Sequence, residues 1–401
     1  MNRILFKSGS TCSFGVLLLA CFLAGCAASS DFVLDTDVDF DTLIERGVAA
    51  EKNGDYDTAI IYFSEAIKLS PENADVYYNR GYAYYLKNDL ENAFLDFDRT
   101  ISLNPENAAA YNARGYIHYI NGNNEKALDD YTSAIKIDPG HALAYQNRGI
   151  LYYDMDEYDY ALENLNRSIQ LFPGNPRAFL YRGMIYYEEW RPGIACDNFS
   201  AAINLDSDYA EAYFYRGMIF FDDGLEYNNI ESFLYAIDDY SDVLRLFPDE
   251  VDALYYRGVS YHRTENFSNA IKDFDRIIQM VPNDAGSYYY RGLSYFIIDE
   301  NSKALADFNQ SIRLYSRNRE AFFWRGVLRH ELGDMSGAVS DFSEAIRLSP
   351  DYAEAYNERG IVYAGSSENN RALADFQEAL RIDPGNEKYR NNLDYVRQAM
   401  R

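Results

Sequence analysis

Positions that hold a small side chain, a large apolar side chain or a charged side chain recur along most of this chain at one fixed spacing. An Arg-Gly pair first occurs at Arg46-Gly47 and returns every 34 residues, apart from one longer step of 41 residues between Gly217 and Gly258. When the glycine is numbered position 8 of each unit, position 20 is alanine in every copy and position 4 is large and apolar. Position 24 is aromatic in every copy except the one with Leu165, and a proline closes most units. A period of this length predicts stacked pairs of helices.

Each recurrent position has a mechanical role in a helical hairpin. Glycine and alanine let the two helices approach closely where they cross, and the aromatic side chains fill the space beside the crossing. Proline ends the second helix because it cannot continue one. The polar segments Asn53–Asp55, Lys87–Asp89 and Gly122–Asn124 predict the turns inside the hairpins. One hairpin cannot bury its own apolar face, so neighbouring hairpins must stack.

The period and these positions resemble the tetratricopeptide (TPR) repeat. The resemblance implies an all-α fold, a right-handed superhelical solenoid of ten helix-turn-helix repeats. We expect the repeats at residues 40–73, 74–107, 108–141, 142–175, 176–209, 210–250, 251–284, 285–318, 319–352 and 353–386. Residues 387–401 place Tyr389, Leu393, Val396 and Met400 on one helical face, which predicts a terminal capping helix.

The sixth repeat carries seven extra residues, between about Leu225 and Leu234. Seven residues are about two helical turns, so they preserve the buried face of a helix. One interpretation is a second helix lengthened at its N-terminus, which projects from the array and splits it into six and four repeats. The other interpretation, given equal weight, is a tolerated loop insertion.

The N-terminus has the features of an export signal. Arg3 and Lys7 precede a short apolar stretch, Phe14–Ala24, which cannot span a bilayer as a mature helix. The stretch ends in Leu23-Ala24-Gly25-Cys26, which resembles the lipobox of bacterial lipoproteins. An ordinary secretory signal with a chance cysteine is the alternative.

The lipobox resemblance implies that residues 1–25 are removed and that Cys26 is acylated, which would anchor the chain stably. Ala27 follows the cysteine where an Asp would favour the inner membrane, so we expect the periplasmic face of the outer membrane, if the cell has one. Residues 26–39 are rich in Ser and Asp and are expected to form an acidic tether. Cys196, the one cysteine left after these steps, is predicted to be a small core residue.

The arginine of each Arg-Gly pair departs from the leucine that is common there in TPR repeats. Position 23, on the second helix, is acidic in seven copies and is Asn164 or Asn198 in two more. Because an acid lies one helix away from most of these cations, we predict a ladder of bracing pairs within the repeats, such as Arg80–Asp96 and Arg114–Asp130. The alternative is a basic stripe that binds an anionic ligand.

By the same resemblance, positions 2, 5, 9, 12 and 13 of each first helix line a concave groove. These positions are largely aromatic and apolar, and positions 5 and 9 contain no Lys or Arg, so the carboxylate clamp of chaperone-binding TPR domains is absent. We predict that a partner contacts Tyr78, Tyr82, Tyr85, Tyr116 and Tyr119. Such a surface suits an extended peptide, an amphipathic helix or a sugar ring. Simple packing among the tyrosines is the alternative.

Composition narrows the classes of function. The formal net charge of −26 would repel nucleic acid, and no basic stripe compensates for it. No metal-protease, phosphate-loop or serine-hydrolase motif occurs, and the four histidines are scattered, with His262 and His330 two repeats apart. We therefore expect no enzyme and no cofactor. The chain is predicted to be an envelope scaffold for protein partners; the alternative is a small-ligand or glycan-binding component of an envelope transporter.

Overall fold

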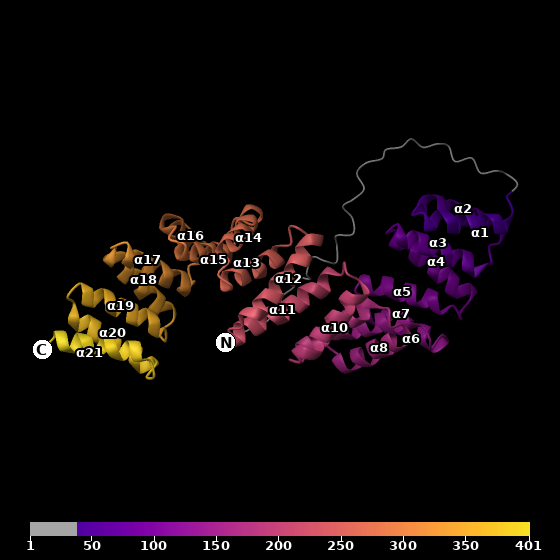
Figure 1. The fold of residues 1–401 in the computed structure, drawn as a ribbon. Coiled ribbons are helices and arrows are strands. Elements are labelled where there is room, and N and C mark those ends of the chain that lie inside the picture. Colours follow the sequence, from indigo (N-terminus) through magenta and orange to yellow (C-terminus); the bar gives the residue numbers. More distant parts are fainter. Residues whose placement is uncertain (1–37) are drawn as a thin grey trace. The chain divides into compact units, whose positions relative to one another are not determined.

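The computed structural model describes residues 38–401, which form α-helices joined by short turns (Figure 1). The predicted signal, Cys26 and most of the tether lie outside the described residues. No helix of the described part is long and apolar enough to cross a membrane. The helices of residues 38–401 are α1 Phe40–Lys52, α2 Tyr56–Leu69, α3 Ala74–Leu86, α4 Leu90–Leu103, α5 Ala108–Ile120, α6 Asn124–Ile137, α7 Ala142–Asp154, α8 Tyr158–Leu171, α9 Pro176–Glu188, α10 Pro192–Leu205, α11 Ala210–Tyr227, α12 Ile230–Leu246, α13 Val251–Arg263, α14 Phe267–Met280, α15 Ala285–Ile297, α16 Asn301–Leu314, α17 Arg319–Glu331, α18 Met335–Leu348, α19 Ala353–Gly365, α20 Asn369–Ile382 and α21 Glu387–Ala399.

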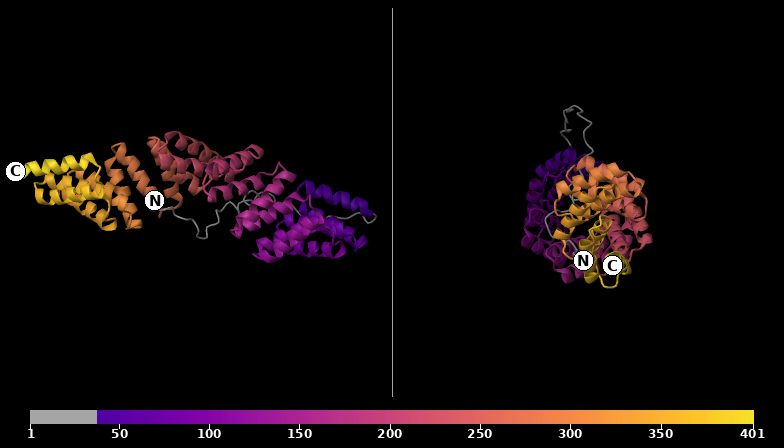
Figure 2. Two further views of the ribbon diagram at one scale, coloured as in Figure 1. Left: turned by 90° about the horizontal axis from the view of Figure 1, so that it is seen from below. Right: turned by 90° about the vertical axis from the view of Figure 1, so that its left-hand side faces the viewer.

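Consecutive helices pair as antiparallel hairpins, from α1–α2 to α19–α20, and α21 packs on α20. Below, helix A and helix B denote the first and second helix of a hairpin. Within each unit, helix B of one hairpin also packs on helix A of the next, as α2 does on α3 and α12 does on α13, and Figures 1 and 2 show this succession within each part of the chain. The expected all-α fold is confirmed. The chain divides into two compact units, of which the first ends at Ala212 and the second is Tyr213–Arg401.

Nine hairpins of residues 38–401 close on a glycine that faces an aromatic ring, and in the fourth hairpin Gly149 faces Leu165. A Cβ atom built on Gly47 would lie 2.5 Å from the Phe63 ring, and one on Gly183 would lie 2.6 Å from the Phe199 ring. Such distances are well inside van der Waals contact, so only glycine fits there without movement of the ring. The alanines at position 20 are fully buried in every hairpin: Ala59, Ala93, Ala127, Ala161, Ala195, Ala236, Ala270, Ala304, Ala338 and Ala372.

The turn inside each hairpin contains one residue in the left-handed region. That residue is glycine at Gly54, Gly122 and Gly333, with φ of 77°, 74° and 85°. The other turns place a residue with a side chain there: Asn88, Asp156, Trp190, Asn228, Glu265, Asp299 and Ser367. The geometry of the hairpin therefore dictates the left-handed conformation, at a steric cost wherever glycine is missing.

The extra residues of the sixth hairpin extend both helices, so the predicted lengthening of the second helix is correct in part and the loop interpretation is wrong. Helix α11 has 18 residues and α12 has 17, whereas helix A and helix B of the neighbouring hairpins have 13 and 14. The reason is a second glycine–aromatic contact one heptad beyond the first. Gly217 faces Tyr240, and Gly224 faces Phe233, with a built Cβ on Gly224 only 2.9 Å from the ring.

Two further expectations need correction. The division between the units falls at Ala212 and Tyr213, near the start of α11, rather than splitting six repeats from four at the insertion. The capping helix α21 buries Tyr389, Leu393 and Val396 as predicted, but Met400 follows the end of the helix and is 43% exposed. Met400 lies beyond the last turn that packs on α20, so its apolar spacing does not lead to burial.

Candidate binding groove and its bracing

The predicted arginine–aspartate pairs form, and they are bidentate. Arg80 donates from Nε and Nη2 to the two carboxylate oxygens of Asp96, both at 2.8 Å. Arg114 makes the same pair of bonds to Asp130, at 2.9 and 2.7 Å. The same fork–carboxylate geometry recurs in five more hairpins: Arg216–Asp239, Arg257–Asp273, Arg291–Asp307, Arg325–Asp341 and Arg359–Asp375. Two parallel charge-assisted bonds fix the crossing of helix A on helix B.

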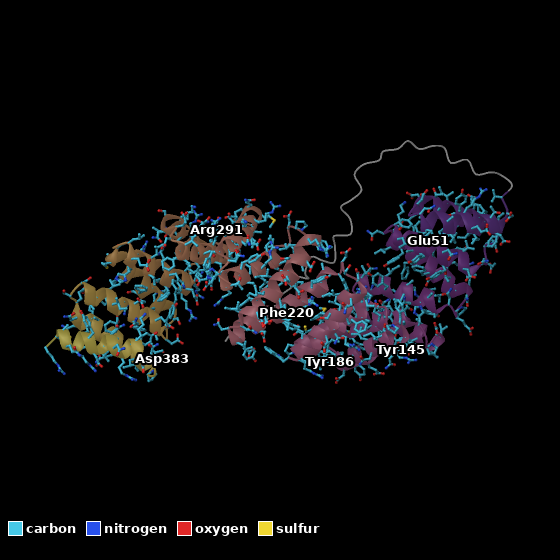
Figure 3. All side chains as sticks on the ribbon, in the orientation of Figure 1. Glu51, Tyr145, Tyr186, Phe220, Arg291 and Asp383 are labelled. Atoms are coloured by element: carbon cyan, nitrogen blue, oxygen red, sulfur yellow. The ribbon has the colours of Figure 1, made fainter. Side chains whose placement is uncertain are left out.

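The arginines also connect neighbouring hairpins, which the sequence analysis did not predict. The third guanidinium nitrogen donates to helix B of the preceding hairpin, from Arg80 to Ser64 at 3.1 Å and from Arg114 to Asp98 at 2.7 Å. Arg291, labelled in Figure 3, reaches Asp275 at 2.6 Å in the same way. One side chain thus holds two second helices, one within its hairpin and one in the hairpin before it.

The carboxylates of this bracing are buried enough for desolvation to matter. Burial raises the pKa of Asp239, Asp273 and Asp307 above the usual value, although the hydrogen bonds and charges of their arginines act in the opposite direction. These ion pairs therefore serve mainly as geometric braces, because the desolvation cost offsets much of the attraction between the charges.

The fourth and fifth hairpins use amides in place of carboxylates. Arg148 Nε donates to Asn164 at 2.9 Å, and Arg182 Nε donates to Asn198 at 2.7 Å. The side-chain NH2 group of each asparagine donates to a backbone carbonyl of its own helix, from Asn164 to Tyr160 and from Asn198 to Ile194. The arginine therefore makes one hydrogen bond to the asparagine, where it makes two to an aspartate in the other hairpins.

The five tyrosines predicted to contact a partner lie in one continuous row on α3 and α5. Ring centroids are separated by 6.4 Å between Tyr78 and Tyr82, 6.0 Å between Tyr82 and Tyr85, 5.8 Å between Tyr85 and Tyr116, and 6.3 Å between Tyr116 and Tyr119. Tyr82 is 37% exposed, whereas Tyr78 also packs on Phe97. The row is therefore both a packed ladder of rings and an accessible surface.

Hydrogen bonding anchors the far end of this row. The Tyr119 hydroxyl donates to Asp154, at the end of α7, and so joins two neighbouring A helices. Burial raises the pKa of Asp154, against the hydrogen bond from Tyr119 and the charge of Arg177. Burial likewise raises the pKa of Tyr85, to about 12. Both tyrosine side chains are half-buried.

Arg177, on α9, lies near the tyrosine row and is a candidate that the sequence analysis missed. Its guanidinium lies 5.7 Å from the centre of the Tyr181 ring, and the Tyr181 ring in turn contacts Tyr153 edge-on at 5.5 Å. Arg177 occupies position 2 of its repeat, where no other repeat has a basic residue. That contrast is visible in the sequence, whereas the prediction that no carboxylate clamp is present rested on positions 5 and 9 alone.

The remaining candidates lie apart from one another. The described residues contain no group of three or more His, Cys, Asp and Glu side chains that could hold a metal ion. His262 Nδ1 lies 3.0 Å from the Ser294 hydroxyl, and His141 caps α7 by accepting from the backbone N–H of Ala144. Cys196 is half-buried, at a position where other hairpins place larger apolar residues.

Several solved structures resemble this chain. The crystal structure of MamA is 26% identical, covers 41% of this chain and 96% of its own, and has a TM-score of 0.36. YrrB, described as a TPR protein with an unusual peptide-binding site, is 25% identical, covers 48% of this chain and 95% of its own, and has a TM-score of 0.40. PilF of Pseudomonas aeruginosa is 17% identical, covers 53% of this chain and 94% of its own, and has a TM-score of 0.48. No curated protein sequence matches the chain.

Family models match the chain in both of its units. The model described as TPR repeat matches residues 52–88 and 328–367. Models described as tetratricopeptide repeat match residues 74–107, 108–141, 233–285 and 353–386. Together these matches span about half of the chain and agree with the period, the hairpins and the glycine–aromatic crossings. The chain belongs to the tetratricopeptide repeat family.

Proposed function

We propose that this protein is a membrane-anchored scaffold of the bacterial cell envelope, which holds an extended segment of a partner protein in the tyrosine groove of its first unit. The observation that carries the proposal is the continuous row from Tyr78 to Tyr119. Its rings come from two neighbouring A helices, and Tyr82 is partly open to solvent. TPR folds bind protein partners, and aromatic surfaces of this kind bury large flat contacts at little cost in side-chain entropy.

The anchor is the second part of the proposal and rests on the sequence. The lipobox-like Leu23-Ala24-Gly25-Cys26 behind an apolar stretch supports acylation at Cys26, and Ala27 supports an outer-membrane address. Residues 26–39 would then hold the first hairpin close to the bilayer surface. Several acyl chains on one cysteine are enough to hold a protein stably at a membrane without a spanning helix.

A pull-down from solubilised membranes tests the groove. The full-length protein is compared with a variant in which Tyr78, Tyr82 and Tyr116 are changed to Ala, and with Tyr160→Ala as the matched control. Tyr160 lies on α8, outside the tyrosine row, and is 55% exposed. The triple variant should lose the partner that the control retains. An equal yield from both variants, each shown to be folded by circular dichroism, would refute binding at this groove.

The same samples address the alternative function. If the groove serves a small ligand or glycan, native mass spectrometry of the wild type should show a bound mass that the triple variant lacks, while the protein partners stay unchanged. That pattern would replace the scaffold proposal by the ligand-binding one.

A further inference from the structure

Arg177 is unusual among the half-buried arginines of the first unit because no aspartate or asparagine of a helix B holds it within the described residues. The other half-buried arginines of the hairpins are held by an aspartate or an asparagine on helix B, as Arg80 is by Asp96 and Arg148 by Asn164. Arg177 has Tyr181 instead, whose ring centre lies 5.7 Å away and whose hydroxyl accepts a hydrogen bond from the guanidinium. A guanidinium carries five N–H donors in a fixed fork, so a half-buried one without a carboxylate partner retains donors for another group.

The surroundings of Arg177 come from several successive hairpins. Its charge acts on Asp154 at the end of α7, on Tyr119 of α5 and on Glu211 at the start of α11. The A helices α5, α7 and α9 pack against one another in this order. Arg177 therefore lies beside the row of tyrosines, on the side away from Tyr78.

The two carboxylates near Arg177 do not satisfy it. Burial raises the pKa of Asp154 and of Glu211, although the charge of Arg177 acts against burial in both cases. Asp154 already accepts from the Tyr119 hydroxyl, and neither carboxylate forms an ion pair with Arg177 in the described residues. The arrangement leaves a cation of fixed position in a chain whose formal net charge is −26.

We propose that Arg177 binds a side-chain carboxylate of the partner segment, while the row from Tyr82 to Tyr119 takes the apolar side chains beside that acid. This inference rests on the proposed function, because it specifies the chemistry of the segment that the groove holds. The partner is a protein segment in which an aspartate or glutamate stands next to apolar or aromatic residues. Charge complementarity selects that chemistry, since Arg177 is the one basic residue at position 2 and lies beside aromatic faces.

The first test uses a random peptide library displayed on phage and selected on the purified mature protein and on Arg177→Gln. Wild type should enrich peptides in which Asp or Glu adjoins an apolar residue. Arg177→Gln should keep the apolar preference and lose the acidic one. Arg191→Gln is the matched control, because Arg191 also stacks on a tyrosine, Tyr186 at 4.7 Å, but is exposed just before α10.

The outcomes distinguish a failure of the proposed peptide binding from a failure of the proposed role of Arg177. If no peptide is enriched by any of the proteins, peptide binding in the groove is wrong, and the role of Arg177 falls with it. If peptides are enriched without an acidic preference, or with the same preference on Arg177→Gln, only the role of Arg177 is wrong.

A synthetic peptide from the selection gives the quantitative test. Replacing its acid by the amide should weaken binding to wild type about tenfold, as expected for the loss of a charge-assisted hydrogen bond. The same replacement should change binding to Arg177→Gln less than about twofold. Arg177→Lys, which keeps the charge but not the fork, should fall between the two, and it replaces the Gln variant if that protein does not fold. Equal losses on wild type and on the variants would overturn the assignment.

Discussion

The arginine of the Arg-Gly pair holds helix B of its own hairpin in nine of the described hairpins, from Arg80 to Arg359. In Arg80 the fork binds Asp96 on its own hairpin and Ser64 on the preceding one, while the Tyr77 ring lies 5.7 Å from the guanidinium. The side chain therefore has a carboxylate, a hydroxyl and an aromatic face around it. Removal of the carboxylate would leave a half-buried cation with a single neutral partner.

Substitutions at Asp96 measure this dependence. Asp96→Ala should reduce the free energy of unfolding by roughly 3 kcal/mol, because the buried charge loses its partner. Asp96→Asn should cost only about 1 kcal/mol, because Asn164 and Asn198 show that an amide can hold the same arginine. Thermal and urea unfolding followed by circular dichroism provide the comparison. Equal losses in the two variants would show that the charge of Asp96 contributes nothing.

His262 is the residue whose titration should affect stability near neutral pH. Burial, and to a smaller extent the charge of Arg263, lowers the pKa of His262 to about 4. The Ser294 hydroxyl donates to the Tyr290 carbonyl and can accept from His262 Nδ1, so the neutral imidazole is already satisfied. Since the folded pKa lies below the unfolded one, the stabilisation is present above about pH 6.5 and is lost as the pH falls toward 4.

A His262→Gln variant isolates this effect from the titration of the carboxylates. Between about pH 7 and about pH 5, wild type should lose roughly 1 to 2 kcal/mol of unfolding free energy relative to the variant. Unfolding of both proteins is measured at the two pH values. If the difference in unfolding free energy between wild type and His262→Gln is the same at both pH values, His262 is not buried in its neutral form.

At the scale of the element, the hairpin can be predicted from sequence because its contacts have a fixed separation. Gly47 meets Phe63 and Arg80 meets Asp96, each 16 residues apart, and these spacings return in nearly every repeat. The lengthened hairpin α11–α12 could not be predicted in the same way. Asp223-Gly224 reads locally as a turn, whereas the contact of Gly224 with Phe233 keeps it helical.

The same register predicts a shortened protein that folds. Deleting Leu225–Glu231 removes seven residues and leaves Asp223-Gly224-Ser232, in which glycine takes the left-handed position of the turn and serine caps the next helix. The contact of Gly217 with Tyr240 is retained. We expect a fully helical protein that is less stable by roughly 1 to 2 kcal/mol, because one glycine–aromatic contact is lost.

Circular dichroism and hydrogen exchange of the deletion protein test this expectation. Protection in α11 and α12 should survive outside the deleted segment. Loss of protection throughout this hairpin would mean that the extension is required for folding and that the heptad relation is incidental.

The groove was partly predictable for a related reason. The register places Tyr78, Tyr82, Tyr85, Tyr116 and Tyr119 on helix A, and the structure joins them in one row. The position of Arg177 beside the same surface depends on the stacking of α5, α7 and α9, which a single repeat does not encode. Residues that act across hairpins are therefore harder to find from sequence than those that act within one.

At the scale of the whole molecule, the proposed membrane anchor rests on a single cysteine, Cys26. Cys26→Ala should move the protein from the membrane fraction to the soluble fraction and abolish incorporation of a palmitate analogue. Cys196→Ala is the matched control and should change neither result, because Cys196 lies on α10, within the folded part of the chain. A Cys26→Ala protein that remains in the membrane fraction would show that another feature provides the anchor.

The most direct measurement of the central claim is photo-crosslinking in living cells from a benzoylphenylalanine placed at Tyr82. The same probe at Tyr160 serves as the reference, because both side chains are exposed but only Tyr82 belongs to the tyrosine row. A partner-binding groove predicts one discrete protein adduct from position 82, mapping to a short segment of the partner, and none from position 160. The absence of a protein adduct at position 82, or the same adducts from both positions, would contradict it.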